Sequence, residues 1–157
     1  MNKHLRTILF ILLAAGQLTF SRYYQPLRFN VDLLYLIIFL IAIRSSFLPS
    51  ILSAALIGLF SDYLSGGVLG VFSFSRTLAA YFLNALSRFL DLKKNIFIFL
   101  LILVSLFLSN LMAFIFYVLI FKMKVTAGLL LLQPLSTALI GTIIMGTKKA
   151  KSLLDVS

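Results

Sequence analysis

The stretch GLFSDYLSGGVLG at residues 58–70 places a carboxylate, that of Asp62, at the end of an apolar run. The chain has only four acidic residues, and a carboxylate near hydrocarbon needs a partner or a polar cavity because its desolvation is costly. Steps of four back from Asp62 reach Gly58, Ala54 and Ser50. A stripe of small residues lets another helix approach closely in a membrane, so we expect these residues to form a packing or protein-interaction face.

The composition around this stretch is that of a membrane protein. The chain has 157 residues, of which 62% are hydrophobic, and a mean hydropathy of +1.12, whereas a soluble domain is nearer half apolar. Its apolar runs are continuous rather than alternating, which favours helices over a barrel. We therefore predict an all-α polytopic membrane protein with a single transmembrane domain over residues 1–157.

Six apolar segments follow one another along the chain. The first has a basic flank and resembles a signal peptide, but we expect an uncleaved anchor because further apolar segments follow it directly. The second is short against the ~20 residues that a span needs, and five spans remain if it is re-entrant. The expected segments are 7–20, 31–43, 47–64, 72–90, 95–121 and 127–146.

The formal net charge of +10 would suggest nucleic acid as a partner of a soluble protein. Here the cations lie in short loops and at the two ends of the chain. With six spans, nine Lys and Arg residues fall on the side of the two termini and five on the other side. This asymmetry predicts that both termini are cytoplasmic. We expect contact with anionic lipids rather than with nucleic acid.

The sequence offers little for catalysis or metal binding. Cys and Glu are absent, and the single histidine, His4, lies beside Lys3 and Arg6. An intramembrane hydrolase needs a nucleophile with a base, a carboxylate pair or metal ligands. We therefore expect no catalytic residue, no metal site and no cofactor.

A glycine-containing loop separates the third and fourth segments. Gly66 and Gly70 break the helical pattern there, and Arg76 is the nearest cation beyond the loop. A hairpin could bring Arg76 to Asp62, and pairing would relieve both desolvation costs. The alternative is two independent charges at the interface. Asp32, at the start of the short second segment, would have to reach the interface as well.

Small and polar residues also recur at helical spacing in the later segments. Such stripes suit close packing of helices within one bundle, and docking of another membrane protein is the alternative. The stripes comprise Ala80 with Asn84, Ser105 with Ser109, and Thr137 with Gly141.

Segments two to four resemble the MreD family, the rod-shape-determining membrane proteins of bacteria. That family opens its second helix on Pro-Asp-Leu-Leu, and this chain has VDLL at 31–34. The family's Gly-Leu-x-x-Asp-x-Leu-Ser-Gly, followed by Leu-Gly, is matched at 58–66 and 69–70. A basic turn at 44–46 and an aromatic residue, Tyr81, in the fourth helix are similar too. The chain departs from the pattern in having valine where the family has proline.

The resemblance implies a non-catalytic inner-membrane scaffold of the cell-elongation machinery that supports peptidoglycan synthesis. It would bind MreC directly and would associate less directly with MreB, with RodA and with the transpeptidase partner of RodA. The family is similar in layout to substrate-binding subunits of energy-coupling-factor transporters, so a vitamin-type binding subunit is the alternative function. Such a subunit would have a polar, aromatic-lined pocket capped by residues 66–75, whereas a scaffold would have an apolar or lipid-filled cleft.

Overall fold

The computed structural model describes residues 31–65, 68–90, 92, 94–122 and 128–146. Throughout these residues the regular structure is helical, without strands. The first expected segment, 7–20, lies outside the described residues. The helices are α2 (Leu33–Arg44), α3 (Phe47–Ser65), α4 (Val71–Ser87), α5 (Asn95–Ile115), its π-helical continuation η2 (Phe116–Ile120) and α6 (Gly128–Met145).

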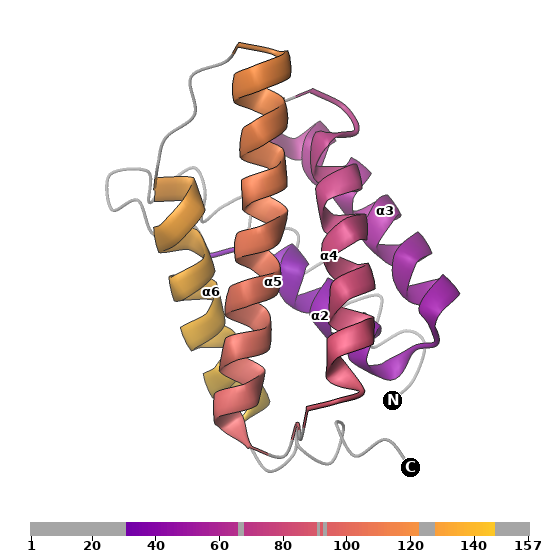
Figure 1. Cartoon of the computed structure of the whole chain (residues 1–157), viewed down its shortest axis with the longest axis vertical. Helices are drawn as coiled ribbons and strands as arrows, with labels where there is room; N and C mark the ends of the chain where they lie inside the picture. Colours follow the sequence, from indigo (N-terminus) through magenta and orange to yellow (C-terminus); the bar gives the residue numbers. More distant parts are fainter. Residues whose placement is uncertain (1–30, 66–67, 91, 93, 123–127, 147–157) are drawn as a thin grey trace.

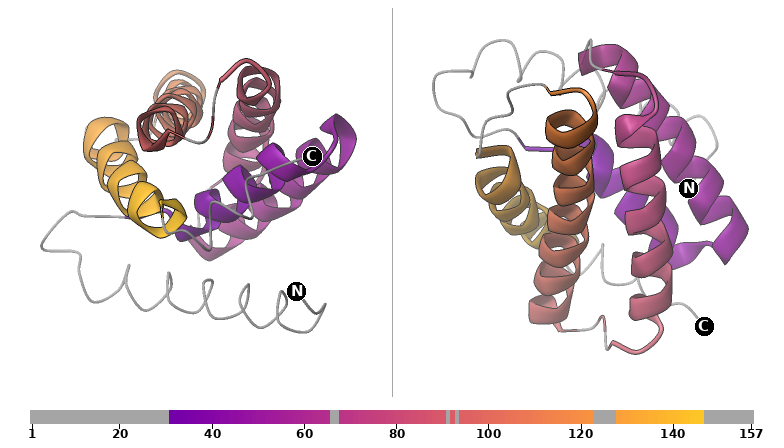
Figure 2. Two further views of the ribbon diagram at one scale, coloured as in Figure 1. Left: turned by 90° about the horizontal axis from the view of Figure 1, so that it is seen from below. Right: turned by 45° about the horizontal axis from the view of Figure 1, so that its top comes forward.

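Four of these helices pack as sequential neighbours, and α2 contacts each of them. The strongest contacts join α3 to α4, α4 to α5 and α5 to α6 (Figure 1). In the view from below in Figure 2, α6, α5 and α4 follow one another around an arc, and α2 and α3 complete the opposite side. The short α2 therefore contacts every other described α-helix.

The burial of α2 agrees with these contacts. Its large side chains Tyr35 and Phe39 are fully buried. The helix has 12 residues, which at a rise of about 1.5 Å each gives a length of about 18 Å. That is well short of the ~30 Å of hydrocarbon in a bilayer. The second segment is thus a short core helix in this bundle, shielded by its neighbours.

Two of the described helices are long and apolar enough to cross a membrane. They are Phe47–Leu64 and Asn95–Ile120, with 18 and 26 residues. Two further apolar helices, Leu33–Arg44 and Leu130–Met145, are shorter. The described part of the chain is therefore all-helical with two helices of membrane-spanning length.

The outward faces of the bundle are apolar and its interior contains polar groups. Among the described residues, twelve polar or charged side chains are buried, whereas a water-soluble protein usually exposes its polar and charged side chains. The outer edges of the bundle are lined by large exposed hydrophobic residues. These include Leu48, Leu52, Leu56, Leu59 and Tyr63 on α3, and Leu131, Leu135, Leu139 and Ile143 on α6.

Candidate functional site: a buried polar cluster between α2, α3 and α4

The helices α3 and α4 form a hairpin in which their backbones touch. A Cβ atom added to Gly58 would lie 2.8 Å from the amide nitrogen of Ser73 and 2.9 Å from the carbonyl oxygen of Phe72. The hydroxyl of Ser73 donates to the carbonyl oxygen of Ala55 at 2.9 Å. Any side chain at position 58 would therefore force the two helices apart.

The carboxylate of Asp62 caps the N-terminus of α4. It accepts hydrogen bonds from the backbone N–H groups of Gly70 and Phe72, both at 2.9 Å, and of Ser73 at 3.2 Å. Amides at a helix N-terminus lack partners within their own helix, and the helix dipole favours an anion there. Gly70 has a φ of +98°, a conformation that glycine adopts readily. Gly66, the other predicted loop residue, lies outside the described residues.

Arg76 forms its ion pair with Asp32 and not, as the sequence suggested, with Asp62. Its other guanidinium nitrogen donates to the hydroxyl of Ser61, and its charged end lies 5.4 Å from the centre of the Phe72 ring. The expected Asp62–Arg76 pair is wrong because the Asp62 carboxylate faces the amides of α4. The start of α2 brings Asp32 to the guanidinium instead.

Asp32 connects this ion pair to two more parts of the bundle. Its second carboxylate oxygen accepts from the backbone N–H of Tyr35 at 2.9 Å and so caps α2. Its own backbone N–H donates to the hydroxyl of Thr137, on α6, at 3.0 Å. We call Asp32, Ser61, Asp62, Arg76 and Thr137 the polar cluster. It joins α2, α3, α4 and α6.

The polar cluster is well shielded from its surroundings. Asp62 and Thr137 are fully buried, and Asp32 and Arg76 are 2% and 3% exposed. A buried ion pair contributes little net stability because desolvation offsets the Coulomb gain, but breaking it leaves an uncompensated charge. The cluster therefore favours this one arrangement of helices over alternative packings that would separate the partners.

The predicted stripe of small residues faces the interior of the bundle. Ala54 is fully buried and Ser50 is 1% exposed, and both lie on the α3 face that continues to Gly58 and Asp62. Of the two interpretations left open by the sequence, the structure thus places this stripe in internal packing against α4 rather than on an exposed docking face.

Other polar side chains, among them Asn84 of a predicted stripe, also connect helices of the bundle. Asn84 donates to the carbonyl oxygens of Ala42 at 3.0 Å and Ser45 at 3.1 Å, which ties α4 to the end of α2. The side-chain amide of Asn110 donates to Gln133 at 3.1 Å, which ties α5 to α6. These interactions, like the polar cluster, are made between helices of the same chain.

Sequence reasoning did not single out two members of the polar cluster for this role. Ser61 directly precedes Asp62, so a helix that buries Asp62 can also bury Ser61. Thr137 belongs to a predicted stripe, but its contact with Asp32 spans 105 positions of sequence. Spacing along one helix carries no signal for such a contact.

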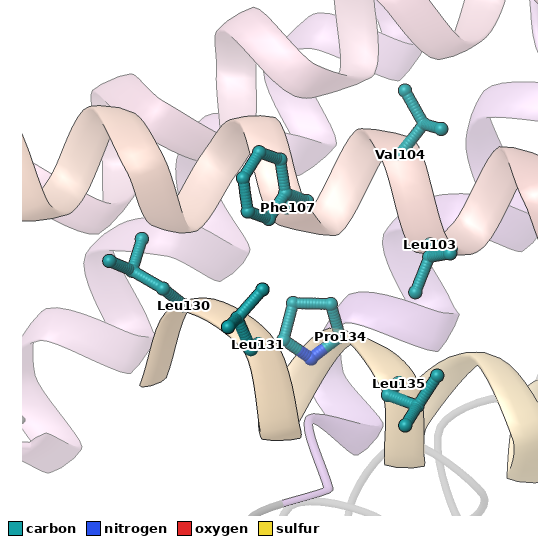
Figure 3. Close-up of a pocket in the computed structure, with 7 residues that line it drawn as sticks. All are labelled: Leu103, Val104, Phe107, Leu130, Leu131, Pro134 and Leu135. Atoms are coloured by element: carbon teal, nitrogen blue, oxygen red, sulfur yellow. The ribbon is translucent and has the colours of Figure 1, made fainter. Parts of the chain in front are cut away.

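A second feature is a groove between α5 and α6 with a volume of about 380 Å³. Figure 3 shows side chains from both helices around it. Its lining is entirely apolar and contains none of the residues predicted from the sequence. The lining residues are Leu103, Val104, Phe107, Leu130, Leu131, Pro134 and Leu135.

Within the described ranges, His, Cys, Asp and Glu form no group of three that could hold a metal ion. The carboxylates of Asp32 and Asp62 accept hydrogen bonds from backbone amides, and Asp32 also pairs with Arg76.

Comparisons with known protein families, curated proteins and solved structures found no match.

Proposed function

We propose that the chain is a non-catalytic scaffold subunit of the MreD type in the bacterial inner membrane, where it binds MreC and supports peptidoglycan synthesis. The observation that carries this proposal is the role of the residues behind the resemblance. Gly58, Asp62 and Gly70 build one hairpin through a backbone contact, a helix cap and a left-handed turn. A motif that specifies a rigid helix arrangement suits a scaffold.

The membrane placement is supported by the distribution of polar and apolar side chains. A bilayer offers no hydrogen bonds, so polar groups must find partners inside the protein. The polar cluster and the Asn84 and Asn110 contacts meet this requirement. The exposed leucines on α3 and α6 suit contact with lipid or with another membrane protein.

The groove between α5 and α6 supports the scaffold over the vitamin-binding alternative. A small-molecule site usually places a few polar groups that fix the ligand's orientation, and the lining of this groove has none. The two carboxylates of the polar cluster hold helices together, which suits a non-catalytic role.

The scaffold proposal is tested by recovery of partners from native membranes. We expect the full chain, carrying an affinity tag, to recover MreC and the elongation glycosyltransferase, and its depletion to widen or round rod-shaped cells. A tagged multi-pass protein of unrelated function serves as the control. Recovery of the ATPase subunits of an energy-coupling-factor transporter, with normal cell shape after depletion, would replace the proposal by its alternative.

The proposed topology has six spans with both termini in the cytoplasm, in which the short α2 crosses the bilayer only together with its flanking residues. It rests on the charge asymmetry of nine cations against five. Reporter fusions at the two ends should both report the cytoplasm. Opposite locations of the two ends would contradict six spans and favour five, whereas periplasmic signals from both ends would overturn the orientation.

A further inference from the structure

The hydroxyl of Ser109 differs from most other hydroxyls of the bundle. In a helix, a Ser or Thr hydroxyl can donate to the carbonyl oxygen four residues earlier. Six hydroxyls of the described helices do so, those of Ser61, Ser75, Thr77, Ser105, Ser136 and Thr142. Ser109 lies inside α5 and is 1% exposed, yet within the described part of the chain its hydroxyl has no hydrogen-bond partner. It is therefore not directed at the carbonyl oxygen of Ser105.

The hydroxyl of Tyr35 approaches the same face of α5. Tyr35 is fully buried on α2, which contacts α5. Its hydroxyl lies next to Ser105, which is one turn, or about 6 Å along the helix, from Ser109. Like that of Ser109, it makes no hydrogen bond of acceptable geometry to any described residue. The charges of Arg76 and Asp32 also act on it, so this hydroxyl lies beside the polar cluster.

Two buried hydroxyls on facing helices require a group that bonds to both. Burial without a hydrogen bond is costly, because the bonds that the hydroxyl made to water are not replaced. Buried polar groups of this kind are usually satisfied by an ordered water, which makes about three hydrogen bonds. With bonds of about 2.8 Å, one water joins hydroxyls about 5–6 Å apart. The third such hydroxyl among the described residues, that of Ser50, lies on α3 and is not part of this pair.

The serine between the two hydroxyls provides the third bond. Ser105 is 3% exposed, and its hydroxyl hydrogen is already donated to the carbonyl oxygen of Leu101. A hydroxyl oxygen also has lone pairs that accept hydrogen bonds. Ser105 is therefore an acceptor, whereas Tyr35 and Ser109 are donors, and water can accept from two groups while it donates to a third.

We propose that an ordered water molecule is bound between α2 and α5, in contact with Tyr35, Ser105 and Ser109. The hydroxyls of Tyr35 and Ser109 donate to the water oxygen, and the water donates one hydrogen to the oxygen of Ser105. The water adds a polar link between α2 and α5 beside the ion pair of Asp32 and Arg76. This inference goes beyond the proposed function and does not depend on the binding of MreC.

Thermal unfolding of the full chain in detergent tests the site through the sign of the shift. Tyr35→Phe and Ser109→Ala should each lower the Tm by about 2–4 °C, the shift expected when a chain of this size loses one net hydrogen bond. The double variant should lose less than the sum, because both hydroxyls bind the same water. A hydroxyl without a partner predicts the opposite sign, since its removal ends a desolvation cost. A rise or no change in the Tm of Tyr35→Phe would therefore overturn the proposal.

Two matched variants serve as controls for the coupling. Ser75→Ala removes a buried hydroxyl that bonds within α4 to the carbonyl oxygen of Val71. Tyr81→Phe removes the hydroxyl of a tyrosine that is 46% exposed. We expect Ser75→Ala to be additive with Tyr35→Phe, and Tyr81→Phe to be additive with Ser109→Ala. Coupling of the controls as strong as that between Tyr35→Phe and Ser109→Ala would show that the coupling does not report a shared water.

A high-resolution crystal structure of the full chain provides a measurement that does not depend on stability. We expect a water peak within hydrogen-bonding distance of the hydroxyls of Tyr35 and Ser109, and its loss in the double variant. Electron density without this peak would overturn the proposal. A direct hydrogen bond between Tyr35 and Ser105, with Tyr35→Phe coupled to Ser105→Ala and not to Ser109→Ala, would also overturn it.

Discussion

Replacement of Gly58 by leucine should lower the free energy of unfolding in detergent by about 3 kcal/mol or more, because overpacking against unyielding atoms is among the costliest substitutions. The atoms that a Cβ would meet belong to the backbone of Ser73 and Phe72, so no side chain can rotate away. The helices α3 and α4 would have to separate, and the cap that Asp62 provides to α4 would be lost with them.

The neighbouring residue provides the control for this prediction. Leu59 is 44% exposed, so Leu59→Ala should cost much less than Gly58→Leu, and Gly58→Ala should fall between the two. Thermal unfolding of the three variants in one detergent measures the order. Equal losses for Gly58→Leu and Leu59→Ala would show that the stripe of small residues faces lipid and does not contact α4.

The positions of the helices could be predicted from the sequence because their ends carry strong local signals. The apolar segments expected at 47–64 and 95–121 correspond to α3 and to α5 with η2. Charged residues and glycines bound these runs, and both signals act within a few residues. The number of membrane spans does not follow from the number of apolar segments. A helix as short as α2 can be apolar on all sides because it is buried in the core of the bundle.

The partner of Arg76 could not be predicted because spacing in the sequence suggests ion pairs only between residues that are close along the chain. The loop after Asp62 brings that residue close to α4, as the sequence predicted. The Asp62 carboxylate, however, accepts hydrogen bonds from the backbone N–H groups at the start of α4 instead of pairing with Arg76. Asp32 is 44 positions from Arg76. Its approach depends on how α2 packs against α4, which no local pattern encodes.

The apolar groove between α5 and α6 could not be predicted from the sequence either, because it depends on how two helices pack. Its volume depends on the angle between α5 and α6 and on the rotamers of large side chains, with Pro134 inside α6. The sequence marks every one of these residues as apolar and gives no reason to separate those that line a groove from those that cover a convex face.

The ion pair between Asp32 and Arg76 leads to the second prediction of a large effect. Asp32→Asn or Arg76→Gln alone should each lower the free energy of unfolding by about 3–5 kcal/mol, because a buried charge is left without its partner. The double variant should be less destabilised than the sum of the two single variants by about 1–3 kcal/mol. Thermal unfolding of the four proteins in detergent, together with rescue of cell shape, measures this coupling.

A second cycle, Asp62→Asn with Arg76→Gln, is the matched control. Asp32 lies at the start of α2 and Asp62 near the end of α3, and both are buried. Asp32 pairs with the guanidinium of Arg76, whereas Asp62 caps α4. We therefore expect a smaller coupling in this cycle than in the first. Additivity of Asp32→Asn and Arg76→Gln, with strong coupling of Asp62→Asn to Arg76→Gln, would restore the pairing suggested by the sequence. Coupling confined to Asp32 and Arg76 would mean that the polar cluster, rather than the hairpin alone, holds α2 against α3 and α4.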